Sequence, residues 1–176
     1  MEFLKIIAIC VVAAIAYGII HDQITARICV EYFTIFHPPV FSTQSPTLLG
    51  IGWGIIATWW VGALLGGLLA TSARAGSKQL LPAAELIKPI SILLLVMAVC
   101  AIVAGLSGFI FARSERVTPP GWVAIRLPPA RNARFMADWW AHSASYASGF
   151  FGGLALCAWV IWSRWHKRRC APTSRP

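Results

Sequence analysis

The stretch FLKIIAICVVAAIAYGIIHDQITARICVEYFTIFHPPVF, residues 3–41, joins a long apolar run to a dense group of ionisable side chains. Residues 3–20 carry a single charge, that of Lys5, and about 20 apolar residues are enough for a helix to cross the hydrocarbon core of a bilayer. No proline follows until Pro38 and Pro39, which disfavour helical geometry in the residues before them. We therefore predict a membrane helix at about residues 3–36 that continues beyond the bilayer.

The composition of the whole chain agrees with a membrane protein. Of its 176 residues, 58% are hydrophobic and 12% are charged, whereas soluble domains carry about 25% charged residues. Three further apolar runs predict helices at about residues 47–70, 86–112 and 130–165. The expected fold is all-α: a polytopic membrane protein with a four-transmembrane-helix bundle in residues 1–165, helices 1 and 4 being extended on the outer side. Residues 166–176 are expected to form a basic cytoplasmic tail.

Lysine and arginine indicate the orientation, because cytoplasmic loops carry an excess of both. With both termini cytoplasmic, nine of the 15 basic residues lie on that side and six on the outer side, so we expect this orientation. The same pattern, together with anionic lipid head groups, accounts for the net charge of +9. We therefore predict no binding to nucleic acid.

The first apolar run has a second interpretation, as a cleaved signal peptide. The sequence Ala-Ile-Ala at residues 14–16 would suit the cleavage site, and cleavage would remove the first helix. Glu2 and the single Lys5 make a weak signal-peptide start, so we favour an uncleaved helix.

Small residues recur at every fourth position in two of the predicted helices. In lipid, such stripes let helix backbones approach closely, and packing then drives their association. We expect both stripes to be contact faces, within the chain or with another membrane protein or a second copy. The stripes are Gly50, Gly54, Thr58, Gly62, Gly66 and Ala70 in one helix, and Ala137, Ala141, Ser145, Gly149, Gly153 and Cys157 in the other.

Two histidines and two aspartates from opposite ends of the chain are predicted to share one level of the membrane. Counting outward from Lys5 puts His21 and Asp22 near the outer interface, and counting back from Arg164 does the same for Asp138 and His142. Imidazole and carboxylate ligands suit a transition metal such as Zn, Fe, Cu or Ni. The four residues are therefore candidate metal ligands. The surrounding polar cluster comprises Gln23, Arg27, Glu31, His37, Arg113 and Arg134.

The same cluster permits two other interpretations. Its acids could pair with arginines and tie the helix ends together, or its ionisable groups could mark a path for protons or a substrate. The first requires pairs between two sets of residues: Asp22, Glu31, Glu115 and Asp138, and Arg27, Arg113, Arg131 and Arg134. A hydrolase triad of Asp138, His142 and Ser145 is disfavoured, because one helix cannot readily aim all three side chains at one substrate atom. Neither a nucleotide-binding motif nor a haem-attachment motif is present, so we predict no cofactor-binding residue; the catalytic residues stay unknown.

The segments HDQITARICVEYFTIFHPP, residues 21–39, and SPTLLGIGWGIIATWWVG, residues 45–62, resemble a group of small bacterial integral membrane proteins. The resemblance covers mainly the first two helices and their connection. It implies a bacterial cytoplasmic (inner) membrane and brings no activity.

Three functions follow as hypotheses. The first is a structural or interaction subunit whose charged outer end binds a partner. The second is a metal-binding membrane protein or metalloenzyme, and the third is a small transporter or channel. The third is disfavoured because the apolar runs carry almost no charge at their centres, where a translocation path needs polar residues.

Overall fold

The computed structural model describes residues 1–76 and 80–169, and every regular element in these two ranges is helical. The long helices agree with the predicted all-α class, and three short helical segments, η1, α5 and η2, accompany them. The elements are α1 (Glu2–Ile28), η1 (Tyr32–Phe36), α2 (Pro46–Ile56), α3 (Trp59–Arg74), α4 (Ala83–Arg113), α5 (Gly121–Ala124), η2 (Pro129–Arg131) and α6 (Asn132–Arg169). The predicted tail of residues 166–176 is helical as far as Arg169, and its remaining residues lie outside the described ranges.

Four helical stretches within the described residues are long and apolar enough to cross a membrane, as the sequence predicts. They are Glu2–Ile28, Pro46–Arg74, Ala83–Arg113 and Pro129–His166. The helix α4 begins slightly earlier than expected, and its first turn contacts the start of the chain, because the N–H of Ala83 donates to Glu2 Oε2 at 2.9 Å.

The first helix is shorter than predicted. It ends at Ile28, and Cys29 has extended backbone geometry before the chain turns again in the π-helical segment η1. The expectation of one helix over residues 3–36 is therefore wrong. The interruption turns the rings of Tyr32 and Phe33 inward, where both are almost fully buried, and this packing competes with continued helix.

The second predicted helix is also interrupted, between Ile56 and Trp59. Thr58 Oγ1 donates to the carbonyl oxygen of Gly54 at 2.5 Å, and such local side-chain bonds compete with the regular helical pattern. The interruption lies against α1, because a Cβ added to Gly18 would meet both Thr58 and the Gly54 carbonyl oxygen.

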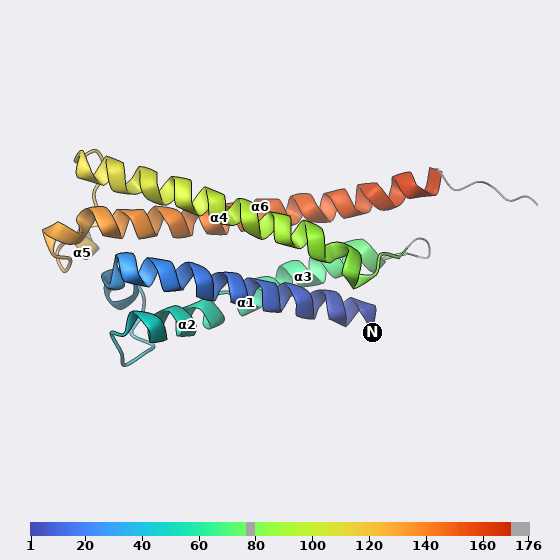
Figure 1. Ribbon diagram of the computed structural model, residues 1–176, viewed down its shortest axis with the longest axis horizontal. Coiled ribbons are helices and arrows are strands. Elements are labelled where there is room, and N and C mark those ends of the chain that lie inside the picture. Colours follow the sequence, from blue (N-terminus) through green and yellow to red (C-terminus); the bar gives the residue numbers. More distant parts are fainter. Residues whose placement is uncertain (77–79, 170–176) are drawn as a thin grey trace, which may run out of the picture.

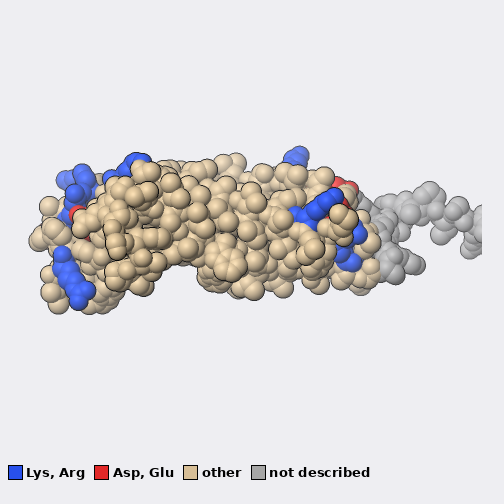
Figure 2. Space-filling view, turned by 90° about the horizontal axis from the view of Figure 1, so that it is seen from below, with Lys and Arg blue, Asp and Glu red and all other residues tan. Residues whose placement is uncertain are grey.

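Figure 1 shows α4 and α6 running side by side along the long axis, with α1 beside α2 and α3. We call the end with residues 29–45 and 114–131 the loop end, and the end with Met1 and the start of α4 the terminal end. In Figure 2, lysine and arginine gather towards these two ends, while the surface between them carries few charges.

Both small-residue stripes contact helices of the same chain. The stripe on α2 and α3 lies on α1, where a Cβ at Gly54 would come within 2.6 Å of Ile19 Cα and one at Gly62 within 2.8 Å of the Cys10 carbonyl oxygen. The stripe on α6 faces α4 through Gly149 and α3 through Gly153. Close backbone approach thus explains the small residues on α2 and α3, whereas the side chains of Met97 and Leu65 occupy the space beside Gly149 and Gly153.

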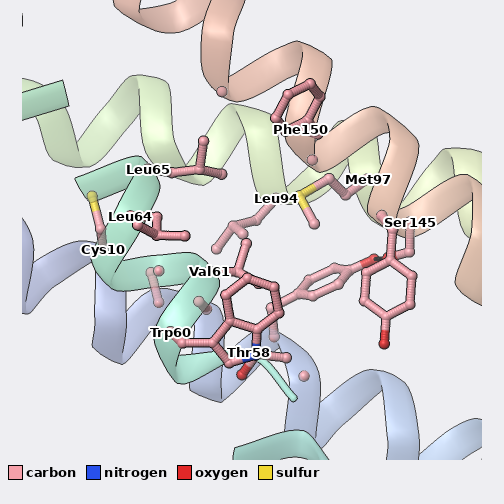
Figure 3. Close-up of a pocket in the computed structure, with 18 of the residues that line it drawn as sticks. Cys10, Thr58, Trp60, Val61, Leu64, Leu65, Leu94, Met97, Ser145 and Phe150 are labelled. Carbon is pink, nitrogen blue, oxygen red and sulfur yellow. Dashed lines mark hydrogen bonds between the residues drawn. The ribbon is translucent and has the colours of Figure 1, made fainter. Parts of the chain in front are cut away.

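Buried apolar side chains form two clusters, one at each end. The terminal cluster includes Ile6, Leu69, Leu86 and Val160, and the loop-end cluster includes Tyr32, Phe33, Leu49, Val123 and Phe135. Between the clusters is a cavity of about 1150 Å³, lined by α1, the end of α2, the α2–α3 interruption, α3, α4 and α6 (Figure 3).

Candidate metal centre

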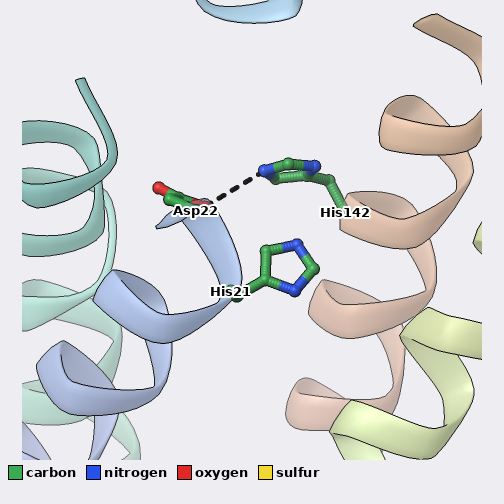
Figure 4. Close-up of side chains that lie close together, drawn as sticks. All are labelled: His21, Asp22 and His142. Carbon is green, nitrogen blue, oxygen red and sulfur yellow. Dashed lines mark hydrogen bonds and ion pairs between the residues drawn. The ribbon is translucent and has the colours of Figure 1, made fainter. Parts of the chain in front are cut away.

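Three of the four predicted ligands meet at the loop-end side of this cavity. His21 and Asp22 are neighbours on α1, and His142 approaches them from α6 (Figure 4). One ligand atom from each residue lies within 4.8 Å of the other two. The rings of His21 and His142 meet edge to face, with 4.5 Å between their centroids.

The hydrogen bonds of His142 define its chemistry. Its Nδ1 lies 2.8 Å from the backbone oxygen of Asp138, which can only accept, so Nδ1 carries a proton. Its Nε2 lies 3.2 Å from Asp22 Oδ1. Nε2 therefore either carries a second proton and donates it to Asp22, or presents a lone pair to a metal ion that Asp22 also binds. A metal-bound histidine usually has this arrangement, its other nitrogen donating to a carbonyl or carboxylate oxygen.

His21 supplies a second nitrogen with no competing partner. Its Nε2 is buried and has no hydrogen bond to any described residue. Buried polar atoms are nearly always hydrogen-bonded, so an orphaned ring nitrogen beside His142 and Asp22 indicates a missing ligand, an ion or a water molecule.

The dimensions of the cluster fit a small cation after modest side-chain movement. Zinc binds histidine nitrogen at about 2.0–2.1 Å, so two ligand atoms in its usual tetrahedral geometry lie about 3.4 Å apart. The observed limit of 4.8 Å is larger than this, so the side chains of His21, Asp22 and His142 would have to close in on a bound ion. Three protein ligands would leave one position open, as in catalytic zinc sites.

Aromatic rings surround the cluster and limit its contact with water. Tyr32 stacks on His142 with 4.4 Å between centroids, and Phe33 meets the same ring edge to face. Tyr17 stacks against His21, and its hydroxyl is hydrogen-bonded to Ser145. In such surroundings charged groups need partners, since isolated buried charges are costly.

The fourth predicted ligand, Asp138, lies near the cluster but is not one of the three residues that meet. It is fully buried, and neither carboxylate oxygen has a hydrogen-bond partner among the described residues. The Cys29 N–H close to it donates instead to the Thr25 carbonyl oxygen at 2.9 Å. Asp138 also interacts electrostatically with the carboxylates of Asp22 and Glu31. This concentration of acidic groups favours a cation.

Cys29, beside Asp138, is a poor ligand in this environment. Burial, with the nearby Asp138 carboxylate, raises the pKa of the Cys29 thiol to about 12, so the thiol remains neutral at physiological pH. Its Sγ donates to Glu31 Oε2 at 3.3 Å. Because the thiolate is the form that binds metals, oxygen and nitrogen ligands are favoured here.

The predicted polar cluster divides into several local contacts. Arg27 bonds the Gln23 side chain at 2.6 Å and Thr47 Oγ1 at 2.9 Å, linking α1 to α2. Within the described residues His37 has no hydrogen bond to His21, Asp22 or His142, and its Nδ1 donates to the Tyr32 carbonyl oxygen at 3.0 Å. Arg113 lies over the ring of Phe109, and Arg134 is exposed.

The expected arginine–carboxylate cap is formed in one place among the described residues. Arg131 Nε lies 3.1 Å from Glu31 Oε1. Asp22 instead meets His142, and Asp138 has no arginine partner. The cap interpretation therefore explains Glu31 but not the two aspartates.

Sequence reasoning missed the aromatic surroundings of the site. Tyr32 and Phe33 follow the unpredicted interruption at Cys29, so a continuous helix would point them elsewhere. The Tyr17–Ser145 contact joins positions 128 apart in the chain, so no local pattern predicts it. Tyr17 lies four residues before His21, and this spacing indicates that the two side chains share one face of the helix.

Comparison with known proteins adds no functional assignment. No family model, curated protein or solved structure matches the chain significantly.

Proposed function

We propose that the chain is an integral protein of the bacterial inner membrane that binds a divalent transition-metal ion through His21, Asp22 and His142. Its four long helices cross the bilayer with both termini in the cytoplasm, which puts the metal site near the outer face. The spans of 27 to 38 residues measure about 40–57 Å, and the hydrocarbon core is about 30 Å thick. The ends of the longest helix therefore extend beyond the core.

One observation carries the proposal: three metal-ligating side chains from two helices converge within 4.8 Å beside a buried, unpartnered nitrogen of His21. The backbone bond to His142 Nδ1 leaves its Nε2 facing the site. A bound cation would also offset the negative charge of the Asp22 carboxylate and of the nearby Asp138 carboxylate. When bound, the ion would supply Lewis-acid chemistry at its open coordination position.

The test is metal analysis of protein purified without a polyhistidine tag, in parallel with single variants. Wild-type protein should retain near-stoichiometric metal, and His142→Gln and Asp22→Asn should each lose most of it. His37→Gln is the matched control, because His37 is also a partly buried histidine at the loop end but lies outside the three-residue group. A well-folded wild type that neither retains metal nor binds added Co²⁺ or Zn²⁺ would refute the proposal.

A structural or interaction subunit remains the second candidate. Exposed side chains at the loop end favour it, since Trp122 and Ile125 are 51% and 87% exposed and Arg116 and Arg134 lie at the same end. Absence of metal binding, combined with co-purification of one defined membrane partner lost in Trp122→Ala, would favour this function. The transporter alternative gains nothing, because the terminal cluster of Ile6, Leu69, Leu86 and Val160 is apolar where a polar path would have to continue.

A further inference from the structure

The cavity beside the metal centre opens at the surface of the helix bundle. Trp60, Leu64 and Phe150 on its lining are 49%, 62% and 53% exposed, and its volume is about 1150 Å³. Binding sites for small molecules usually measure about 300–1,000 Å³. The volume therefore corresponds to that of a ligand site.

The walls of the cavity are suited to an apolar chain. Val61, Leu65, Leu94, Met97 and Phe150 line it from three helices, as Figure 3 shows. These positions fall within the apolar stretches of α3, α4 and α6. A molecule that fills the cavity would thus come from the bilayer core and would not need to pass through water.

One end of the cavity is chemically different from the rest. His21, Asp22 and His142 line it there, and Tyr17 and Ser145 add two hydroxyl groups. Thr58, at the interruption between α2 and α3, lies on the same lining. A long apolar wall that ends in a few polar groups matches a molecule with a long tail and a small polar head.

The head must be small and must carry oxygen. Tyr32 and Phe33 pack directly on His142, which leaves little room for a bulky phospholipid head group on that side. An oxygen atom could occupy the open position of the metal or accept a hydrogen bond from a protonated histidine. Fatty acids and fatty alcohols satisfy both conditions, because their heads are a carboxylate and a hydroxyl group.

We propose that the cavity binds a single-chain lipid, with its tail against Val61, Leu94 and Met97 and its oxygen-bearing head at His21, Asp22 and His142. The position of the head rests on the proposed metal function, whereas the position of the tail rests on the cavity alone. The chemistry shared by the candidate ligands is one long chain and a terminal oxygen, as in fatty acids and fatty alcohols.

The test is photolabelling of the full chain in phosphatidylcholine nanodiscs with palmitic acid and, separately, hexadecanol, each carrying a mid-chain diazirine. Adducts mapped by mass spectrometry should concentrate on the cavity residues Val61, Leu94 and Met97. Labelling by palmitic acid alone would show that the site requires an anionic head group. Labelling by both probes would show that the site also accepts a neutral head group. Equal labelling of cavity residues and of the exposed Val99 in wild-type protein would overturn the proposal.

A matched pair of variants tests the tail position. Leu94→Trp places an indole ring where the tail is proposed to lie and should lower labelling of Val61 and Met97 about tenfold, which corresponds to about 1.4 kcal/mol of binding free energy. Leu95→Trp adds the same ring at the adjacent position, which is 65% exposed and does not line the cavity, and should leave labelling unchanged. Equal labelling of the two variants, if both are folded, would contradict the assignment.

Metal content measured on the same samples separates the two proposals. Bound metal without cavity labelling would overturn the lipid inference and leave the metal function standing. Cavity labelling with no metal, even after addition of Zn²⁺, would overturn the metal function and support tail binding. Cavity labelling by the acid that weakens in His142→Gln, while Val61 stays the labelled site, would support the head position.

Discussion

His142 Nε2 lies 3.2 Å from Asp22 Oδ1 although 120 residues separate them in the chain. Both side chains are at least nine-tenths buried, so the contact joins α6 to α1 where water screens it little. The pair therefore holds together the two halves of the molecule at the level where the candidate ligands meet.

Removing one member of this pair should destabilise the metal-free protein. Asp22→Ala is expected to lower the free energy of unfolding by about 3–5 kcal/mol, because a buried charge loses its partner. Denaturant unfolding in nanodiscs after chelation measures the change. The double variant Asp22→Ala, His142→Ala should cost less than the sum of the single variants. Strict additivity would show that the two side chains are not coupled.

Replacing Asp138 should have the opposite effect. Both its oxygens are buried without hydrogen-bond partners among the described residues, so Asp138→Leu is expected to stabilise the metal-free protein by about 1–3 kcal/mol. Thermal unfolding of the chelated protein measures this. Arg134→Leu, at an exposed position one turn earlier on α6, is the control and should change stability by less than about 0.5 kcal/mol. A destabilised Asp138→Leu protein would reveal a partner for this carboxylate.

Stability should fall at acid pH partly through His37. Burial lowers the pKa of His37 below its usual 6.5, and the nearby His142 also lowers it, while its bond to the Tyr32 carbonyl oxygen and the charge of Asp22 oppose the shift. Below pH 6.5 the unfolded chain binds a proton at this residue that the folded chain does not, so the free energy of unfolding rises with pH there. The contribution is fully present above pH 6.5 and is lost as the pH falls towards the folded pKa.

The measurement compares the free energy of unfolding of wild-type and His37→Gln protein between about pH 7.5 and about pH 5. The slopes of this free energy against pH should differ by at most about 1.4 kcal/mol per pH unit, the limit for one titrating group. The variant should show the smaller slope. His166→Gln, at the exposed terminal end of α6, is the matched control. Identical slopes in wild type and His37→Gln would contradict a lowered pKa for His37.

The glycine contact between α1 and α2 should be needed for the site. A Cβ at Gly54 would lie 2.5 Å from the backbone nitrogen of Ile19, and backbone atoms cannot move aside without shifting a helix. Gly54→Ala should therefore destabilise the protein by about 1–3 kcal/mol and weaken Zn²⁺ binding, since α1 carries His21 and Asp22.

Gly67→Ala is the control for this substitution, because a Cβ there meets nothing within 4 Å. In a helix the change from glycine to alanine is favourable by about 1 kcal/mol, so this variant should be as stable as wild type or more stable. Zinc titration and thermal unfolding measure both variants. Equal behaviour of the two would show that α1 and α2 can separate at no cost.

The sequence was informative about this protein wherever the signal is local. The lengths of the apolar runs predict the four membrane-length helical stretches, and the four-residue spacing of the small-residue stripe in residues 50–70 predicts a face that does pack on α1. Counting residues along each helix put His21, Asp22 and His142 at one level. These features depend on the rise per residue and on the side chains of a single helix, so one chain segment is enough to predict them.

Tertiary structure alone decided which side chains meet. The rotation of α1 and α6 about their axes depends on contacts such as Gly18 with Thr58 and Gly149 with Met97, and it brings His142 to Asp22 while leaving Asp138 without a partner. The interruptions at Cys29 and Thr58 and the cavity between the end clusters have the same origin. Each depends on packing between segments far apart in the chain, which no local pattern of residues records.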